Sequence, residues 1–211
     1  MDFSWDQIQR RPDGKTFLLW RHEKLFTLGI VQKASKVMDV GGWGQLASRL
    51  VDEGCYVTLV DIMGPDQYYP NRVRNGPWNF VQGDITKPNI VTLFSSTQDV
   101  VTCYETLEHV DDQFMAIQNI FSILKEGGSF VGTVPVPGFS HEADDPNVKF
   151  LTPLELSNML GVAGFKNHRI TTTSSVHEQG PQGCYFFTAQ KPFLGLPAVE
   201  KKLSVDLDSV D

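Results

Sequence analysis

Short apolar runs of strand length alternate with stretches of helical periodicity along most of this chain. A short apolar run bounded by glycine, asparagine or a change to helical spacing predicts a buried β-strand. Seven such strands are predicted, over residues 36–40, 56–60, 79–82, 99–103, 129–133, 168–172 and 184–189. Strands that alternate with helices are typical of a parallel sheet covered by helices on both faces, so the fold class is α/β.

Three segments show helical spacing clearly. The helix predicted between the first two strands has an apolar side formed by Leu46, Ala47, Leu50 and Val51. It ends at Gly54, because glycine readily takes the left-handed conformation that closes a helix. A second helix is predicted within residues 111–128, with the apolar side Phe114, Ile117, Phe121 and Leu124. A third begins at Thr152, where Glu155 has the spacing of a capping box and Pro153 takes the first helical position.

A length of 211 residues allows one domain with a substantial core and short additions at its ends. We expect this domain over residues 36–191. An arm or helix at residues 1–35 is expected to cover the ligand site, and residues 192–211 form a tail. Residues 63–78 hold too many Pro, Gly and Asn residues for a regular helix, so a loop is expected there.

The formal charge of −7 limits the range of partners. Binding to a nucleic-acid duplex draws on clustered Lys and Arg, so nucleic acid is an unlikely partner. The three cysteines show neither CxxC nor zinc-type spacing, which favours buried thiols in a reducing compartment. The N-terminus lacks a secretory pattern, and no apolar stretch approaches about 20 residues. We therefore expect a cytoplasmic protein without membrane attachment.

A glycine-rich turn follows the first predicted strand. The segment DVGGWG places Gly41, Gly42 and Gly44 directly after a buried strand. At such a turn the backbone approaches a ligand closely, and the following helix start offers unpaired N–H groups. This feature alone indicates little, because a tight strand-to-helix turn needs glycine even without a ligand.

Two carboxylates follow at the ends of the next two strands. Asp61 ends the second strand twenty residues after Gly41, where it can accept hydrogen bonds from both hydroxyls of a ribose. Asp84 ends the third strand at the same sheet edge, where it can accept from an adenine amino group. Each could instead cap a turn or a helix. Together with the glycine turn they indicate an adenosine-containing ligand.

A dinucleotide-dependent dehydrogenase would share this opening motif. Its pyrophosphate site favours a further glycine in the helix start, whereas this chain continues with Gln45 and Leu46. Nothing in a dehydrogenase predicts Asp84 or the later segment ETLEH. The dehydrogenase alternative is therefore disfavoured.

The segments DVGGWG, LVDI, QGDI and QDVVTCYETLEHVDDQFMAIQNIFSILKEGGSFVGTVPVP resemble the class I S-adenosylmethionine-dependent methyltransferases, in the group with E-x-L-E-H after the fourth strand. The resemblance runs from about residue 36 to residue 191. It implies a Rossmann-like, mostly parallel sheet of order 3-2-1-4-5-7-6 with the last strand antiparallel. It also implies S-adenosylmethionine as the cofactor.

By this resemblance, the methionine amino group is bound by the acid that ends the first strand and by a backbone carbonyl that ends the fourth. These positions are Asp39, which could also simply cap the turn, and Cys103 with Tyr104. Ile62 and Ile85, next to the two adenosine carboxylates, are included in the predicted cofactor site.

The glycine pattern departs from that of the family. The family's glycines would fall at 41, 43 and 45, but this chain has Trp43 and Gln45. The resemblance therefore transfers directly only to Gly41, besides the acid before it. Gly42 and Gly44 are predicted as further backbone contacts.

Methyl transfer from a sulfonium mainly requires that the nucleophile is held in line and that water is excluded, although a hydroxyl or ammonium acceptor also needs a base. Glu105, Glu108 and His109 are spaced so that a helical turn would gather them on one face. His109 and Glu105 are candidate catalytic residues, and His141 in the loop after the fifth strand is a third. Alternatively, His109 is a structural residue of the site wall and His141 a solvated loop residue.

The sequence predicts a methyltransferase acting on an O or N nucleophile of a small or medium-sized metabolite. One alternative is a metal-assisted RNA 3′-end ribose 2′-O-methyltransferase, because such enzymes resemble the Glu-x-x-Glu-His segment. That enzyme needs a further histidine where this chain has Val148, and His141 lies seven residues earlier. The other alternative is a non-catalytic protein of this fold that binds a partner through its basic N-terminal segment.

Overall fold

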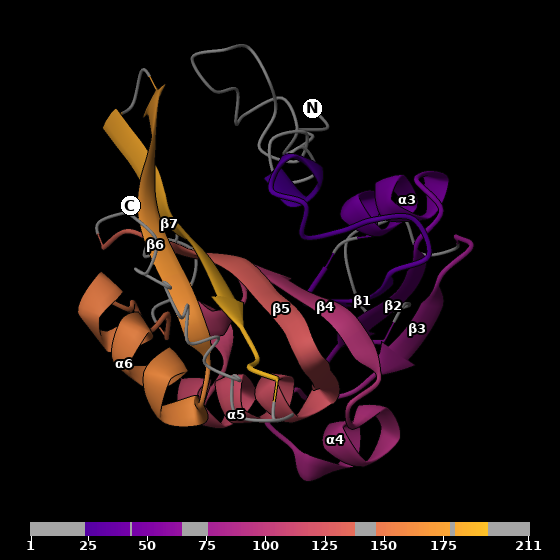
Figure 1. The fold of residues 1–211 in the computed structure, drawn as a ribbon. Coiled ribbons are helices and arrows are strands. Elements are labelled where there is room, and N and C mark those ends of the chain that lie inside the picture. The colour runs from indigo at the N-terminus through magenta and orange to yellow at the C-terminus, as the bar shows by residue number, and fades with distance from the viewer. Residues whose placement is uncertain (1–23, 43, 65–75, 138–146, 178–179, 194–211) are drawn as a thin grey trace, which may run out of the picture.

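The computed structural model describes residues 24–42, 44–64, 76–137, 147–177 and 180–193. Seven strands form one sheet in the order β3-β2-β1-β4-β5-β7-β6 (Figure 1). Their bounds are β1 (Lys36–Val40), β2 (Tyr56–Asp61), β3 (Asn79–Gln82), β4 (Gln98–Tyr104), β5 (Leu124–Pro135), β6 (Lys166–His177) and β7 (Gly180–Gln190). Strands β1 to β5 pair in parallel, and β7 runs antiparallel to both β5 and β6. The predicted α/β class, strand order and antiparallel last strand are confirmed.

Strands β6 and β7 are longer than the sequence predicts. They pair with each other from Lys166–Gln190 to His177–Gly180, whereas β5 pairs with β7 only between Ser129–Gln190 and Pro135–Cys184. The rest of the hairpin extends beyond the end of β5. The apolar runs cover only the part of this hairpin that lies alongside β5.

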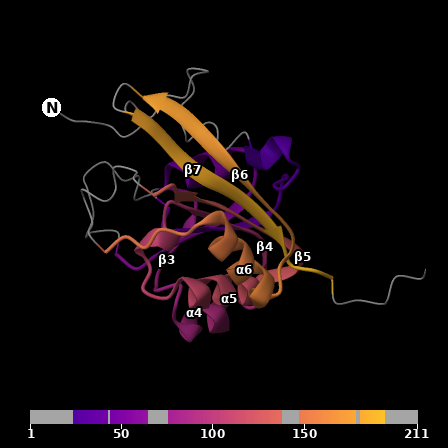
Figure 2. The same cartoon turned by 90° about the vertical axis from the view of Figure 1, so that its left-hand side faces the viewer.

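Helices cover both faces of the sheet (Figures 1 and 2). One face carries α4 (Pro88–Phe94), α5 (Gln113–Ile123) and α6 (Pro153–Ala163). The other carries α3 (Gln45–Asp52) and the segment from residue 24, whose residues 24–27 are helical. Leu25 and Val31 of that segment are buried against this face, so the described part of the predicted arm belongs to the hydrophobic core.

The expected apolar side of α5 is confirmed in part, since Ile117 is fully buried and Phe121 packs against the core. The helix ends at Ile123, and Leu124 already has extended backbone and begins β5. Its fully buried apolar residues are Ala116, Ile117, Ile120 and Ile123. Two polar residues share the buried side because they satisfy loop carbonyls: the Gln113 amide donates to Leu107 O, and the Asn119 amide donates to Ile85 O at 2.8 Å.

The start of α6 follows the sequence prediction. Thr152 Oγ1 accepts from the Glu155 N–H, and Glu155 Oε2 accepts from the Thr152 N–H at 2.8 Å, which completes the capping box. These hydrogen bonds lower the pKa of Glu155. Helix α4, by contrast, was not predicted, because it is only seven residues long and buries Ile90 alone.

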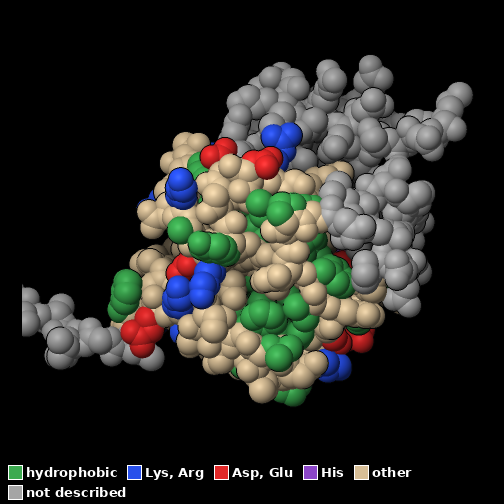
Figure 3. Space-filling model, turned by 90° about the vertical axis from the view of Figure 1, so that its right-hand side faces the viewer, with side chains coloured by type: hydrophobic (Ala, Val, Ile, Leu, Met, Phe, Trp, Pro, Cys, Tyr) green, Lys and Arg blue, Asp and Glu red, His purple; other side chains and the backbone are tan. Residues whose placement is uncertain are grey.

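No helix within the described ranges is long and apolar enough to cross a lipid bilayer. Figure 3 shows the side of the molecule that lies at the right of Figure 1. Apolar side chains form several small groups there, among side chains of both charges.

Candidate functional site

The carboxyl ends of four neighbouring strands meet at one edge of the sheet. Val40 pairs with Val60 and with Cys103, while Asp61 pairs with Gln82. Backbone hydrogen bonds continue past the strand ends, from Gly41 N to Val60 O and from Gly83 N to Asp61 O, each at 2.8 Å. The glycine turn and the ends of β2, β3 and β4 therefore face one region, where ligands bind in open α/β sheets.

Asp39 lies beneath the glycine turn and is almost fully buried. Its Oδ1 accepts a hydrogen bond from Thr102 Oγ1 on β4 at 2.8 Å. A Cβ at residue 42 would overlap Asp39 Oδ2, so only glycine lets the turn fold over this carboxylate. The site therefore holds a buried acid directly under the half-buried backbone of Gly41 and Gly42.

Each of the three glycines is required in the turn for a different physical reason. Gly41 and Gly44 have φ values of 70° and 83°, in the left-handed region that favours glycine. A Cβ at Gly41 would also overlap Thr106, whose hydroxyl lies 3.3 Å from Val40 O. The unusual spacing of Gly41, Gly42 and Gly44 is thus explained by two conformations and one close contact.

Gly42→Ala is expected to lower the free energy of unfolding by about 1–2 kcal/mol, since a well-packed site must shift to admit the methyl group. It should also weaken donor binding, because Asp39 or the turn has to move. Urea denaturation and calorimetric titration measure the two effects. Gly161→Ala on the exposed face of α6 meets no atom within 4 Å and is the control. A variant as stable as the parent would contradict the close contact.

Asp61 and Asp84 both lie at the predicted edge and both also shape local turns. Asp61 is buried, and its Oδ1 accepts from the Met63 N–H at 2.9 Å. Asp84 Oδ1 accepts from the N–H and the hydroxyl of Thr86 at 2.9 and 2.7 Å. A carboxylate has about four acceptor positions, so a turn bond does not by itself prevent such an acid from binding a ligand.

The two isoleucines next to these acids differ in position. Ile62 is 63% exposed at the edge. Ile85 is buried in the core under α5, and its carbonyl accepts from Asn119. The side chain of Ile62 can face a ligand, whereas that of Ile85 supports the strand end from below.

Cys103 and Tyr104 end β4, and both are buried. Burial, together with the nearby carboxylates of Glu108 and Asp39, raises the pKa of the Cys103 thiol well above its ordinary value. The thiol therefore stays protonated, and a nucleophilic role for Cys103 is disfavoured.

The predicted helical turn that gathers Glu105, Glu108 and His109 is wrong. Only a short 3₁₀ turn forms, η1 (Leu107–His109), and Glu105 precedes it in left-handed backbone with φ 50°. Glu108 is buried, while the His109 side chain is 38% exposed. His109 Nε2 lies 3.9 Å from Glu108 Oε1, so a buried carboxylate stands beside an accessible imidazole.

Residues without a local sequence signal hold this turn. The Gln113 amide donates to Leu107 O at 3.1 Å and to Lys149 O at 2.7 Å, and the Lys149 N–H donates to Glu108 O at 2.9 Å. Gln113 therefore joins η1 to the segment before α6. This link cannot be predicted from the spacing of residues along the chain, because its partners are far apart in the sequence.

The alternative of a metal-assisted RNA methyltransferase requires a set of metal ligands, and the described part of the chain contains none. No three His, Cys, Asp or Glu residues in it come together in a way that could hold a metal ion. His141 lies outside the described residues.

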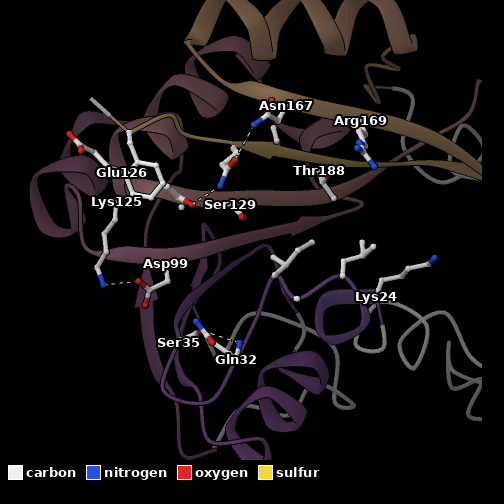
Figure 4. A pocket seen from close by; sticks show the side chains of 18 of the residues that line it. Lys24, Gln32, Ser35, Asp99, Lys125, Glu126, Ser129, Asn167, Arg169 and Thr188 are labelled. Atoms are coloured by element: carbon white, nitrogen blue, oxygen red, sulfur yellow. Dashed lines mark hydrogen bonds and ion pairs between the residues drawn. The ribbon is translucent and has the colours of Figure 1, made fainter. Parts of the chain in front are cut away.

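A large cavity of about 820 Å³ lies at the opposite, amino end of the strands (Figure 4). Some of its polar groups pair with one another, as in the ion pair of Lys125 Nζ with Asp99 Oδ1 at 2.7 Å and the bond of Asn167 to Gln190 at 3.2 Å. Burial opposes ionisation of Asp99, but the bonds from Lys125 and the Lys36 N–H lower its pKa. The cavity reaches Phe186 on β7, but none of the predicted acids or turn glycines of the carboxyl edge lines it, so it is not the predicted site.

The strand order and the acid-lined carboxyl edge define the class: this is the fold of the class I S-adenosylmethionine-dependent methyltransferases. A methyltransferase-domain family model matches residues 13–170. This chain belongs to that family, whose methyl donor is S-adenosylmethionine. The narrower E-x-L-E-H grouping stays a prediction.

Known proteins agree with this assignment. The ubiquinone biosynthesis O-methyltransferase of Psychrobacter arcticus is 30% identical over 171 residues, which are 71% of this chain and 65% of that relative. A methyltransferase from Archaeoglobus fulgidus has a TM-score of 0.63 at 20% identity, over 83% of this chain and 95% of its own. Phosphoethanolamine N-methyltransferase 2 of Haemonchus contortus was solved with S-adenosylmethionine. It has a TM-score of 0.63 at 13% identity, over 82% of this chain and 52% of its own. The chain thus spans just under two thirds of the length of the curated relative.

Proposed function

We propose that this protein transfers a methyl group from S-adenosylmethionine to a hydroxyl oxygen of a small molecule. The observation that carries the proposal is the carboxyl edge, where Asp39, Asp61 and Asp84 lie at the ends of consecutive strands around a glycine turn. The choice of oxygen rests on the similarity to O-methyltransferases of ubiquinone biosynthesis.

The charges at this edge fit the donor. Asp39, Glu105 and Glu108 all lie close enough to Cys103 to raise its pKa, so negative charge gathers at the end of β4. When bound, S-adenosylmethionine supplies a methyl group already activated on a positively charged sulfur. A buried group of carboxylates favours a ligand with sulfonium and ammonium charges.

In this proposal each residue has a definite task. Asp61 and Asp84 hold the adenosine, Asp39 and the backbone of Gly41 and Gly42 hold the amino-acid end, and His109 takes the proton from the acceptor hydroxyl. The exposure of His109 beside buried Glu108 supports its role as the base. Roles for His141 and Glu105 remain further proposals, as does the covering of the donor site by the N-terminal arm, of which Leu25 and Val31 pack in the core.

A small acceptor is also favoured over a nucleic acid. Lys and Arg side chains on the described surface of Figure 3 lie among Asp and Glu side chains, and the formal charge is −7. A cytoplasmic location is supported by the three cysteines, which are buried and unpaired with each other.

Calorimetric titration with S-adenosylmethionine and S-adenosylhomocysteine tests the donor site. Saturable binding is expected, and the absence of heat at millimolar ligand would favour the non-catalytic alternative. Transfer of radiolabelled methyl from the donor to small phenols and alcohols, followed by chromatography, then tests the reaction. A matched set of small amines is assayed in parallel, and label in the amines alone would overturn the choice of oxygen.

A further inference from the structure

The hydroxyl of Thr133 is a buried polar group without an evident structural task. Thr133 lies near the end of β5 and is fully buried. Its Oγ1 has no hydrogen-bond partner among the residues that the structure describes. Such a group costs stability, and buried hydroxyls nearly always have a partner. An unpartnered hydroxyl at the functional edge therefore points to a ligand.

The alternation of side chains along β5 places this hydroxyl on one face. Phe130 and Val134 belong to the core on the side of α5, whereas Val131 belongs to the core on the side of α3. Thr133, two residues after Val131, therefore lies on the α3 side. This is the face that also carries Asp39, bonded to Thr102.

Two aromatic residues flank Thr133 on this face. Tyr104 pairs with it on β4, and Phe186 pairs with it on β7. Both belong to the core cluster on the α3 side, and side chains of paired residues lie next to each other. The Thr133 carbonyl accepts from the Glu105 N–H at 3.1 Å, so this residue is anchored to the segment that leads to His109.

We propose that Thr133 is a specificity-determining residue of the methyl acceptor site, where its hydroxyl hydrogen-bonds a phenolic ring that lies between Tyr104 and Phe186. The inference rests on the proposed function and adds the class of acceptor. A flat, uncharged ring with a hydroxyl group suits this position, because two aromatic side chains offer apolar contact and one hydroxyl offers a hydrogen bond. The acids Asp39 and Glu105 on neighbouring positions disfavour an anionic acceptor.

Thr133→Val tests the proposal, because valine keeps the shape of threonine and removes only the hydroxyl. Thr133→Ser is the matched control, since it keeps the hydroxyl. The probe is catechol, and its binding is measured as the rise in the thermal midpoint of the S-adenosylhomocysteine complex. We expect catechol to bind about tenfold more weakly to Thr133→Val, near parental binding in Thr133→Ser, and S-adenosylmethionine affinity within twofold in both.

The stability of the free protein separates this role from a structural one. Without catechol, the thermal midpoint of Thr133→Val should equal or exceed that of the parent, because no bond is lost. A lower midpoint would show a structural hydrogen bond and overturn the inference, as would unchanged catechol binding. If the parent binds S-adenosylmethionine but not catechol, the inference fails while the proposed function stands. If the parent does not bind S-adenosylmethionine, the proposed function itself fails and the inference with it.

Discussion

His109→Ala is expected to lower kcat for methyl transfer about a hundredfold or more, the usual contribution of a positioned base. The imidazole is partly exposed on η1 and lies 3.9 Å from the buried Glu108 carboxylate, so it can reach an acceptor that enters at this edge. Donor binding should change little, because the residues proposed to hold the donor lie at the ends of β1, β2 and β3.

The measurement compares initial rates at saturating donor with the affinity for S-adenosylmethionine from calorimetry. His168→Ala is the control, since His168 contacts Ser157 on α6 at 2.9 Å and lies away from the carboxyl edge. We expect this control to keep a nearly parental kcat. If the His109→Ala enzyme is as fast as the parent, His109 is not the base and is instead a structural residue in the wall of the site.

Asp61→Ala is expected to weaken S-adenosylmethionine binding roughly 10–100-fold, which corresponds to about 1–3 kcal/mol for charge-assisted hydrogen bonds to the ribose. The Asp61 carboxylate is buried at the end of β2. A side chain from another position would have to move into this place to accept the same hydrogen bonds from the ribose. Asp61→Asn should also bind weakly, although its amide oxygen can keep the turn bond from Met63.

Calorimetric titration gives the affinity, and the urea midpoint of each variant shows whether the turn still folds. The control is Asp52→Ala at the exposed end of α3, which should leave both values near those of the parent. Parental affinity in Asp61→Ala would remove this residue from the donor site. A loss in Asp61→Ala alone, with full binding in Asp61→Asn, would assign the effect to the turn.

The succession of strands and helices was predictable because it depends on local spacing. Each strand of the sheet corresponds to an apolar run, and Thr152 with Glu155 announces the start of α6 through contacts within one turn. The exceptions follow the same logic. Helix α4 is too short to show a period, and α5 ends at Ile123 because the next strand starts at once.

The site was predictable only in part. The placement of Asp39, Asp61 and Asp84 at one edge could be predicted because acids at strand ends share one edge in any parallel sheet. Their role in binding the donor stays a prediction. The expectation that Glu105 joins Glu108 and His109 on one helical face failed, because the backbone at Glu105 is left-handed and the turn starts at Leu107. Periodicity does not reveal such a local conformation.

By itself, the sequence determined the order of the strands, the family and the positions of three acids at strand ends, since these leave patterns within one strand or helix. Only the tertiary structure decided which distant residues meet. Thr102 reaches Asp39 across 63 positions, Gln113 reaches Lys149 across 36, and Thr133 comes between Tyr104 and Phe186 through strand pairing. Burial and cross-strand register create these neighbours, and neither depends on spacing along the chain.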